Sequence, residues 1–234
     1  MKRALTAARE TVVARLPDGV RQRLGPDARY VHMLAVDHMW VRLAFPNRHR
    51  LAEGVWRGAQ PLPHHIRRLR SEGLRTIVNL RGPAKTSTYA LENAACAECG
   101  VNLIDFAMKS RGAPSRAVLI AARDLFDRIE YPVLIHCKSG ADRAGLMSAL
   151  YLHLKMGVPV ETARHQLSLR FGHIRQADTG ILDAVFERYL MDTAARAMPF
   201  MEWVETVYDA SELQRSYSAK RWANRITGGL LRRE

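Results

Sequence analysis

Residues 132–145 read PVLIHCKSGADRAG, and this stretch gives the strongest indication of the fold. Its first half is a short apolar run, typical of a strand that is buried on both faces in a parallel sheet. Its second half leads into a helix that we predict over residues 143–155. The loop between them can wrap an anion, because successive backbone N–H groups and the helix N-terminus direct positive charge inward.

Strand and helix patterns alternate on the N-terminal side of this stretch. The predicted strands cover residues 54–57, 76–80, 101–106 and 132–136. The predicted helices between them cover residues 64–72, 88–98 and 115–129, the last with Ser115 as its N-cap. The order predicts an α/β fold: a three-layer sandwich with a central, mostly parallel sheet flanked by helices and joined by right-handed crossovers.

The pattern is helical throughout beyond residue 157. Predicted helices cover residues 160–169, 180–192 and 199–208. We expect one α/β domain over residues 45–195. Residues 1–44 are predicted to form a basic helical N-terminal extension, and residues 196–234 a helical, basic C-terminal extension.

The amino-acid composition indicates which class of protein this is and which class of partner it binds. The 234 residues are 47% hydrophobic and 25% charged, which excludes a wholly disordered or collagen-like chain. The net charge of +13 favours phosphate-rich partners. Aromatic residues make up only 7% and do not alternate with the basic ones, so we expect no nucleic-acid partner.

Cysteine usage and hydropathy indicate the compartment. Three cysteines are too few for a disulfide scaffold, which favours a reducing environment. Neither a signal peptide nor a run of about 18 uncharged apolar residues is evident. We therefore predict a cytoplasmic protein. Its basic extensions suggest peripheral contact with the inner membrane face; the alternative is that these charges are only solvated.

The loop after the central strand carries the candidate chemistry. Cysteines at helix N-termini or beside cations have a lowered pKa, so we expect Cys137 to be a thiolate able to attack phosphorus. Arg143 follows after five residues, and its planar guanidinium can hold two phosphate oxygens at once. The candidate oxyanion-binding backbone amides belong to Lys138, Ser139, Gly140, Ala141 and Asp142.

The sequence here resembles the cysteine-based phosphatases of the tyrosine and dual-specificity class, whose signature is His-Cys-x5-Arg. His136, Cys137, Gly140 and Arg143 match it. Residues 55–61, VWRGAQP, resemble the YRSAQP segment of a bacterial and fungal dual-specificity-like branch, and residues 79–81 also match. The resemblance implies the phosphatase fold and hydrolysis of phosphate monoesters through a phosphocysteine, without metal or cofactor. It also implies that His136 holds the loop and tunes the thiol.

The chain departs from that family at two positions. Ala144 stands where the family has a Ser or Thr that assists breakdown of the phosphocysteine, so slow turnover, or assistance from Ser139, is a hypothesis. The family's general acid is an Asp about thirty residues before the cysteine. Asp105 lies there but within a predicted strand; Asp142, placed as in myotubularin-type phosphatases, is the alternative.

Substrate and rival functions stay open at this point. Lys138 and the net charge favour an acidic, multiply phosphorylated or lipid-linked substrate, including a lipopolysaccharide phosphate, over a phosphotyrosine or phosphoserine protein. Arg57 and Arg81 are candidates for the rim of the phosphate pocket, or for structural ion pairs. One rival is a phosphate-binding pseudophosphatase with little turnover. Another is a sulfur- or arsenate-handling enzyme, for which Cys96 and Cys99 are the only support.

Several further residues have both a structural and a functional interpretation. Cys96 and Cys99 are expected to be ordinary core or surface cysteines, with a redox link to Cys137 as the alternative. The isolated histidines His64, His65 and His173 are expected to cap or pack.

Overall fold

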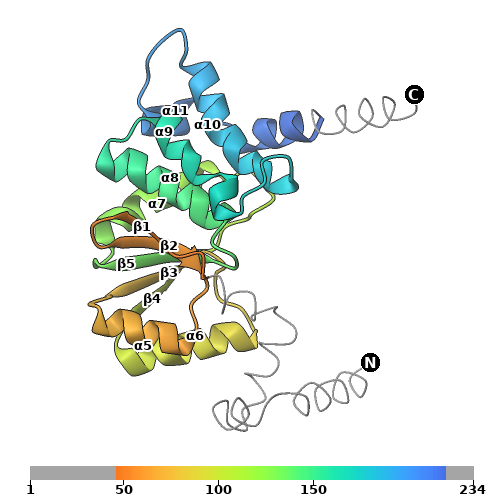
Figure 1. Ribbon diagram of the computed structural model, residues 1–234. Coiled ribbons are helices and arrows are strands. Elements are labelled where there is room, and N and C mark those ends of the chain that lie inside the picture. Colours follow the sequence, from red (N-terminus) through yellow and green to blue (C-terminus); the bar gives the residue numbers. More distant parts are fainter. Residues whose placement is uncertain (1–45, 220–234) are drawn as a thin grey trace, which may run out of the picture.

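A computed structural model of the protein describes residues 46–219, and these residues form a five-stranded sheet between two layers of helices (Figure 1). The strands are β1 (His49–Ala52), β2 (Val55–Ala59), β3 (Thr76–Asn79), β4 (Asn102–Asp105) and β5 (Val133–Cys137). Their order across the sheet is β1-β2-β5-β3-β4. Strand β1 is antiparallel to β2, and the other three pairings are parallel. The predicted three-layer α/β fold is confirmed.

The register of the parallel strands brings their carboxyl ends to one edge. Ala59 of β2 pairs with Cys137 of β5, and Asn79 of β3 pairs with His136. On its other side Asn79 pairs with Asp105 of β4. Ligands of open α/β sheets bind at this edge, so the topology itself places Cys137 and Asp105 on the functional side of the sheet.

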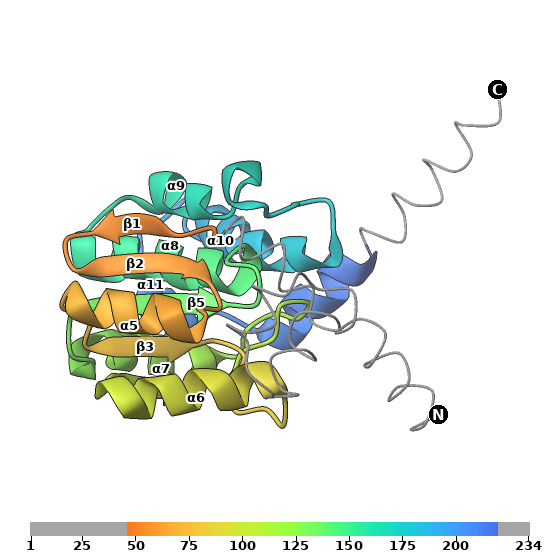
Figure 2. The same ribbon diagram turned by 60° about the horizontal axis from the view of Figure 1, so that its bottom comes forward.

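Helices cover both faces of the sheet (Figures 1 and 2). One face carries α5 (Pro63–Ser71) and α6 (Ser87–Cys99). The other carries α7 (Arg116–Arg128), α8 (Asp142–Met156), α9 (Val160–Ala163), α10 (Ile181–Asp192) and α11 (Phe200–Thr206). Along β5, Leu134 joins the smaller core cluster on the α5 side while Val133 and Ile135 join the larger one, as a strand buried on both faces requires.

The predicted strands and most helix boundaries are confirmed. The Ser115 hydroxyl accepts a hydrogen bond from the Val118 amide, which makes it the N-cap of α7. Gly100 ends α6 in the left-handed conformation, with a φ of 62°. Strand β1 was not predicted, because four residues at a sheet edge carry little periodic signal.

The predicted helix at residues 160–169 is wrong beyond its first turn. Only α9 is α-helical, and the chain continues through the short 3₁₀ turns η1 (Arg164–Gln166) and η2 (Leu169–Phe171). The Gln166 carbonyl accepts a hydrogen bond from Arg57 at 2.7 Å. A helix ending at residue 169 would leave that carbonyl among its last four, which have no partner within the helix, and here the contact with distant β2 pairs it instead.

The core continues past residue 195, where the sequence predicts the start of an extension. Phe200, Trp203 and Tyr208 are buried in the same cluster as β5. The Tyr208 hydroxyl donates to the carbonyl of Pro114 at 2.7 Å, which ties the segment after α11 to the loop before α7. Residues 210–219 are helical, and Leu213 among them is buried.

The predicted helices of residues 1–44 and the tail at 220–234 lie outside the described residues. Within residues 46–219, no helix combines the length and apolar character needed to cross a bilayer.

Candidate active site

Cys137 is the last residue of β5 and lies at the floor of a loop that leads directly into α8. Its side chain is buried, with 2% of the residue exposed. The N-cap residue of α8, Ala141, provides no side-chain hydrogen bond to the first turn. Because the first N–H groups of a helix have no partner within it, this uncapped end next to a buried cysteine can bind an anion.

The loop depends on a glycine. Gly140 has a φ of +75°, and a Cβ built there would lie 2.6 Å from the carbonyl carbon of Gly58 and 2.7 Å from the amide nitrogen of Ala59. Both atoms belong to the backbone of β2, which cannot move aside. The loop therefore packs against β2 only with glycine at this position.

We expect Gly140→Ala to lower the free energy of unfolding by at least about 2 kcal/mol, since strain and backbone overlap act together. Urea denaturation measures the loss. Gly157→Ala is the control: its φ is +66°, but nothing lies within 4 Å of the added Cβ, so only the cost of the left-handed conformation, about 1 kcal/mol, applies. Equal losses in the two variants would contradict the packing argument.

Arg57 lies beneath the loop and is fully buried, so its guanidinium is not part of an exposed pocket rim. It donates to the carbonyls of Gly140 at 2.6 Å and Ala141 at 3.1 Å. Its other nitrogen donates to the backbone and side-chain oxygens of Gln166 at 2.7 and 2.8 Å. The guanidinium also stacks on Phe171, 4.1 Å from the ring centroid. Burial lowers the pKa of Arg57 to about 10, against the opposing effect of Cys137 and Asp142, so the group stays charged.

Arg143 lies in the first turn of α8 and reaches the loops that follow β3 and β4. One guanidinium nitrogen donates to the carbonyls of Leu80 at 3.3 Å and Met108 at 3.5 Å, which are long hydrogen bonds. Its Nε is buried without a partner among the described residues. A buried charged donor left free in this way is suited to an anion at the same edge.

His136 has a buried carboxylate neighbour that the sequence does not reveal. Its Nε2 lies 2.7 Å from the Glu92 carboxylate of α6, and both side chains are fully buried. Gln60 donates to the other Glu92 oxygen at 2.7 Å and accepts a hydrogen bond from Arg81. Nδ1 of His136 lies 3.3 Å from the Cys137 carbonyl oxygen. This chain of contacts fixes the start of the loop and includes Arg81.

Asp142 is engaged by His173, an isolated histidine expected only to cap or pack. Nδ1 of His173 lies 2.7 Å from Oδ1 of Asp142, and Nε2 lies 2.6 Å from Oδ2 of Asp183. The histidine side chain is fully buried, while that of Asp142 is 24% exposed. Since Asp183 is in α10, the histidine joins the N-terminus of α8 to that helix.

Asp105 lies at the same edge of the sheet, two strands away from Cys137. One of its oxygens accepts a hydrogen bond from Asn79 at 2.7 Å, and the other accepts one from the Tyr89 hydroxyl at 2.5 Å. The bond to Asp105 raises the pKa of Tyr89 to about 12. Both carboxylate oxygens are therefore already engaged.

The remaining loop residues differ in exposure. Lys138 and Ser139 are exposed, and Ala144 is fully buried in the larger core cluster. Asn47 donates to the Ser139 carbonyl at 2.9 Å and so ties the loop to the segment before β1.

Cys96 and Cys99 lie in α6, and Cys96 belongs to the smaller core cluster, on the opposite face of the sheet from Cys137. All three cysteines are free thiols. Burial, together with Glu92 and Cys99, raises the pKa of Cys96 to about 12. Cys96 is thus a buried, unreactive thiol.

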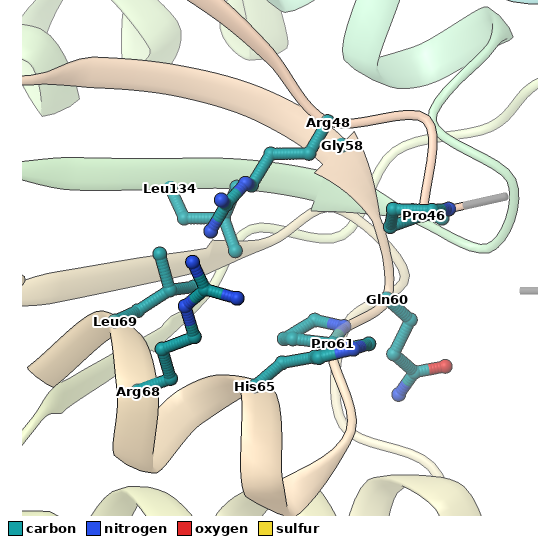
Figure 3. A pocket seen from close by; sticks show the side chains of 10 residues that line it. Pro46, Arg48, Gly58, Gln60, Pro61, His65, Arg68, Leu69 and Leu134 are labelled. Carbon is teal, nitrogen blue, oxygen red and sulfur yellow. The ribbon is translucent and has the colours of Figure 1, made fainter. Parts of the chain in front are cut away.

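A separate pocket of about 130 Å³ opens between β2 and α5 (Figure 3). Arg48 and Arg68 extend into it, and each lies within 4.0 Å of Glu72. Burial and the neighbouring cations lower the pKa of His65 in its wall to about 4, so this histidine is neutral. Cys137 does not line the pocket, although Gly58 and Ala59, which the loop packs against, do.

The sequence is similar to those of known proteins. Residues 45–181 match a family model described as a DSP-PTPase phosphatase fused to NAD+ kinase. Inositol diphosphatase DSP3 of Arabidopsis thaliana is 30% identical over 118 residues, which are 47% of this chain and 56% of that protein. The chain thus spans little more than half the length of this curated relative.

Two solved structures with a similar chain path are those of TpbA and PTPMT1. TpbA of P. aeruginosa is 21% identical with a TM-score of 0.46, covering 74% of this chain and 91% of that one. PTPMT1 in complex with PI(5)P is 24% identical with a TM-score of 0.46, covering 63% of this chain and 98% of that one.

Proposed function

The chain belongs to the DSP-PTPase phosphatase family, and from this we propose that it hydrolyses phosphate monoesters through a phosphocysteine on Cys137. One observation carries the proposal. A buried cysteine, the uncapped N-terminus of α8 and the partly unpaired Arg143 guanidinium meet at one loop. Together they form a site suited to a phosphate dianion above a nucleophilic sulfur.

The reaction has two steps. In the first, the Cys137 thiolate attacks phosphorus in line, the phosphorus–oxygen bond to the leaving group breaks, and a nearby acid protonates the departing oxygen. In the second, water attacks the phosphocysteine, the same residue takes up a proton, and the thiolate and inorganic phosphate are released. Arg143 and the loop amides stabilise the charge on the equatorial oxygens in both steps.

We assign the acid to Asp142. Its Oδ1 is fixed by His173, and its Oδ2 has no hydrogen-bond partner among the described residues, so one oxygen can face the substrate. Both oxygens of Asp105 are already occupied by Asn79 and Tyr89. Asp105 is the alternative, and comparing Asp142→Asn with Asp105→Asn on a poor leaving group decides between them.

The substrate class we propose is a small molecule or lipid headgroup bearing several phosphates. Lys138 is exposed on the loop after β5, and Lys109 and Arg111 are exposed on the loop after β4, at the same edge of the sheet. The curated relative named an inositol diphosphatase supports this choice over a phosphotyrosine protein.

Phosphate release tests the function. Purified protein is incubated with p-nitrophenyl phosphate, inositol polyphosphates including a diphosphoinositol, a phosphoinositide in vesicles and a phosphotyrosine peptide. We expect release from all, with the highest kcat/KM on the multiply phosphorylated compounds and a decline with salt. Acid-quenched protein should carry one phosphoryl group on Cys137 by mass spectrometry. No release and no adduct with any compound would remove the proposal.

Ala144 supports a slow second step, and the extreme case is a phosphate-binding module with little turnover. We expect a burst of about one equivalent of p-nitrophenol followed by a slow steady state. Ala144→Ser should raise the steady-state rate about tenfold, because its hydroxyl assists attack on the phosphocysteine, while the buried hydroxyl costs about 1 kcal/mol of stability.

Stopped-flow absorbance measures both phases. Ala149→Ser is the matched control, because Ala149 is also fully buried in α8. A linear time course in the native protein, unaffected by Ala144→Ser, would show that the second step is not limiting.

A further inference from the structure

The side chain of His173 lies between two carboxyl groups, in a row of three titratable side chains. His173 follows η2 in the chain, and its ring lies between Asp142 at the start of α8 and Asp183 in the first turn of α10, at 2.7 and 2.6 Å. The histidine side chain is fully buried and that of Asp183 is 13% exposed. A capping or packing histidine needs one partner at most, whereas this one uses both ring nitrogens on carboxylates.

Two carboxyl groups at hydrogen-bond distance from the two ring nitrogens favour a charged imidazole. Burial opposes the charge, but the hydrogen bonds to Asp142 and Asp183 outweigh it and raise the pKa of His173 to about 9. Both ring nitrogens are then donors, as two carboxylate acceptors require. These two carboxyl groups are the titratable groups that face the ring from α8 and α10. The guanidinium of Arg57 in β2 interacts electrostatically with Asp142.

We propose that His173 is a positioning residue for Asp142: anchored by Asp183, its imidazolium holds Oδ1 of Asp142 and leaves Oδ2 turned to the substrate. The inference rests on the proposed function and deepens it. Asp142 carries the exchangeable proton on Oδ2. When the ester bond breaks, that proton goes to the leaving oxygen, and the new carboxylate faces the imidazolium. His173 keeps its proton in both steps.

This arrangement predicts an effect that depends on the leaving group. p-Nitrophenolate leaves without a proton, whereas an alkoxide must be protonated as it departs. Loss of His173 should therefore affect alkyl phosphates far more than p-nitrophenyl phosphate. A purely structural role would affect both equally, because the loop and its nucleophile serve both substrates.

The variants are His173→Leu, which removes charge and donor, and His173→Asn, which keeps a donor without the charge. We expect His173→Leu to lower kcat on an alkyl phosphate about 10–100-fold and on p-nitrophenyl phosphate less than about threefold. His173→Asn should recover part of the loss. The pH optimum on the alkyl phosphate should rise by about one unit once the cation is gone. His165→Asn, in an exposed position of η1, is the control.

Equal losses on the two substrates, or an unchanged pH optimum, would overturn the proposal. A second measurement does not depend on turnover. Because it is made on the native protein, it stays informative even if the His173 variants fail to fold. ¹⁵N NMR of the His173 ring in the native protein should show an imidazolium at pH 7, and a neutral ring in that spectrum contradicts the inference. The native protein could show the imidazolium and still release no phosphate from any compound. In that case the proposed function is wrong, whereas the assignment of a charged His173 between Asp142 and Asp183 still holds.

Discussion

Cys137→Ser is expected to lower kcat on p-nitrophenyl phosphate at least about 10⁴-fold, because a serine hydroxyl in this loop has no base to activate it. The rest of the anion site stays in place: the uncapped α8 terminus and Arg143 do not depend on the sulfur. The variant should therefore still bind inorganic phosphate or vanadate within a few-fold of the native affinity. Steady-state kinetics and calorimetric titration measure the two properties separately.

Cys99→Ser is the control for that experiment. Cys99 is half-buried in α6, away from the loop, and its replacement should leave kcat unchanged. Native-like turnover by Cys137→Ser would remove the phosphocysteine mechanism. Loss of phosphate binding together with turnover would instead show that the sulfur is needed to hold the loop open.

Arg57→Met should lower the free energy of unfolding by about 3 kcal/mol or more and abolish turnover with it. The change keeps most of the buried volume but leaves the carbonyl oxygens of Gly140, Ala141 and Gln166 without their donor, and buried acceptors that lose a charged partner cost about 1–3 kcal/mol each. Urea denaturation and p-nitrophenyl phosphate assays measure the two losses.

Arg50→Met on the neighbouring strand β1 controls for the loss of an arginine as such. Arg50 is exposed, and its side chain donates a long hydrogen bond of 3.4 Å to the Ala52 carbonyl. That variant should change stability by less than about 0.5 kcal/mol. If Arg57→Met were as stable and active as Arg50→Met, Arg57 would not be the support of the loop.

Sequence patterns alone predict the four parallel strands, most of the helices and the loop between residues 137 and 143. These features rest on short-range patterns: an apolar run, a cysteine and an arginine at fixed spacing, and caps such as Ser115 and Gly100. A pattern of this kind is complete within a few residues, and the strand–helix alternation then leaves few topologies. Even the meeting of Cys137 and Asp105 at one edge follows from the parallel order of the strands.

The contacts that hold this loop come from segments that are distant in the chain. Arg57 contacts Gln166 across 109 positions, and His136 pairs with Glu92 of a helix on the α5 side of the sheet. His173 reaches Asp142 across 31 positions, and nothing beside it in the chain marks it as different from other isolated histidines. Buried charges need partners, and which partner is near is decided by how distant segments pack, not by local periodicity.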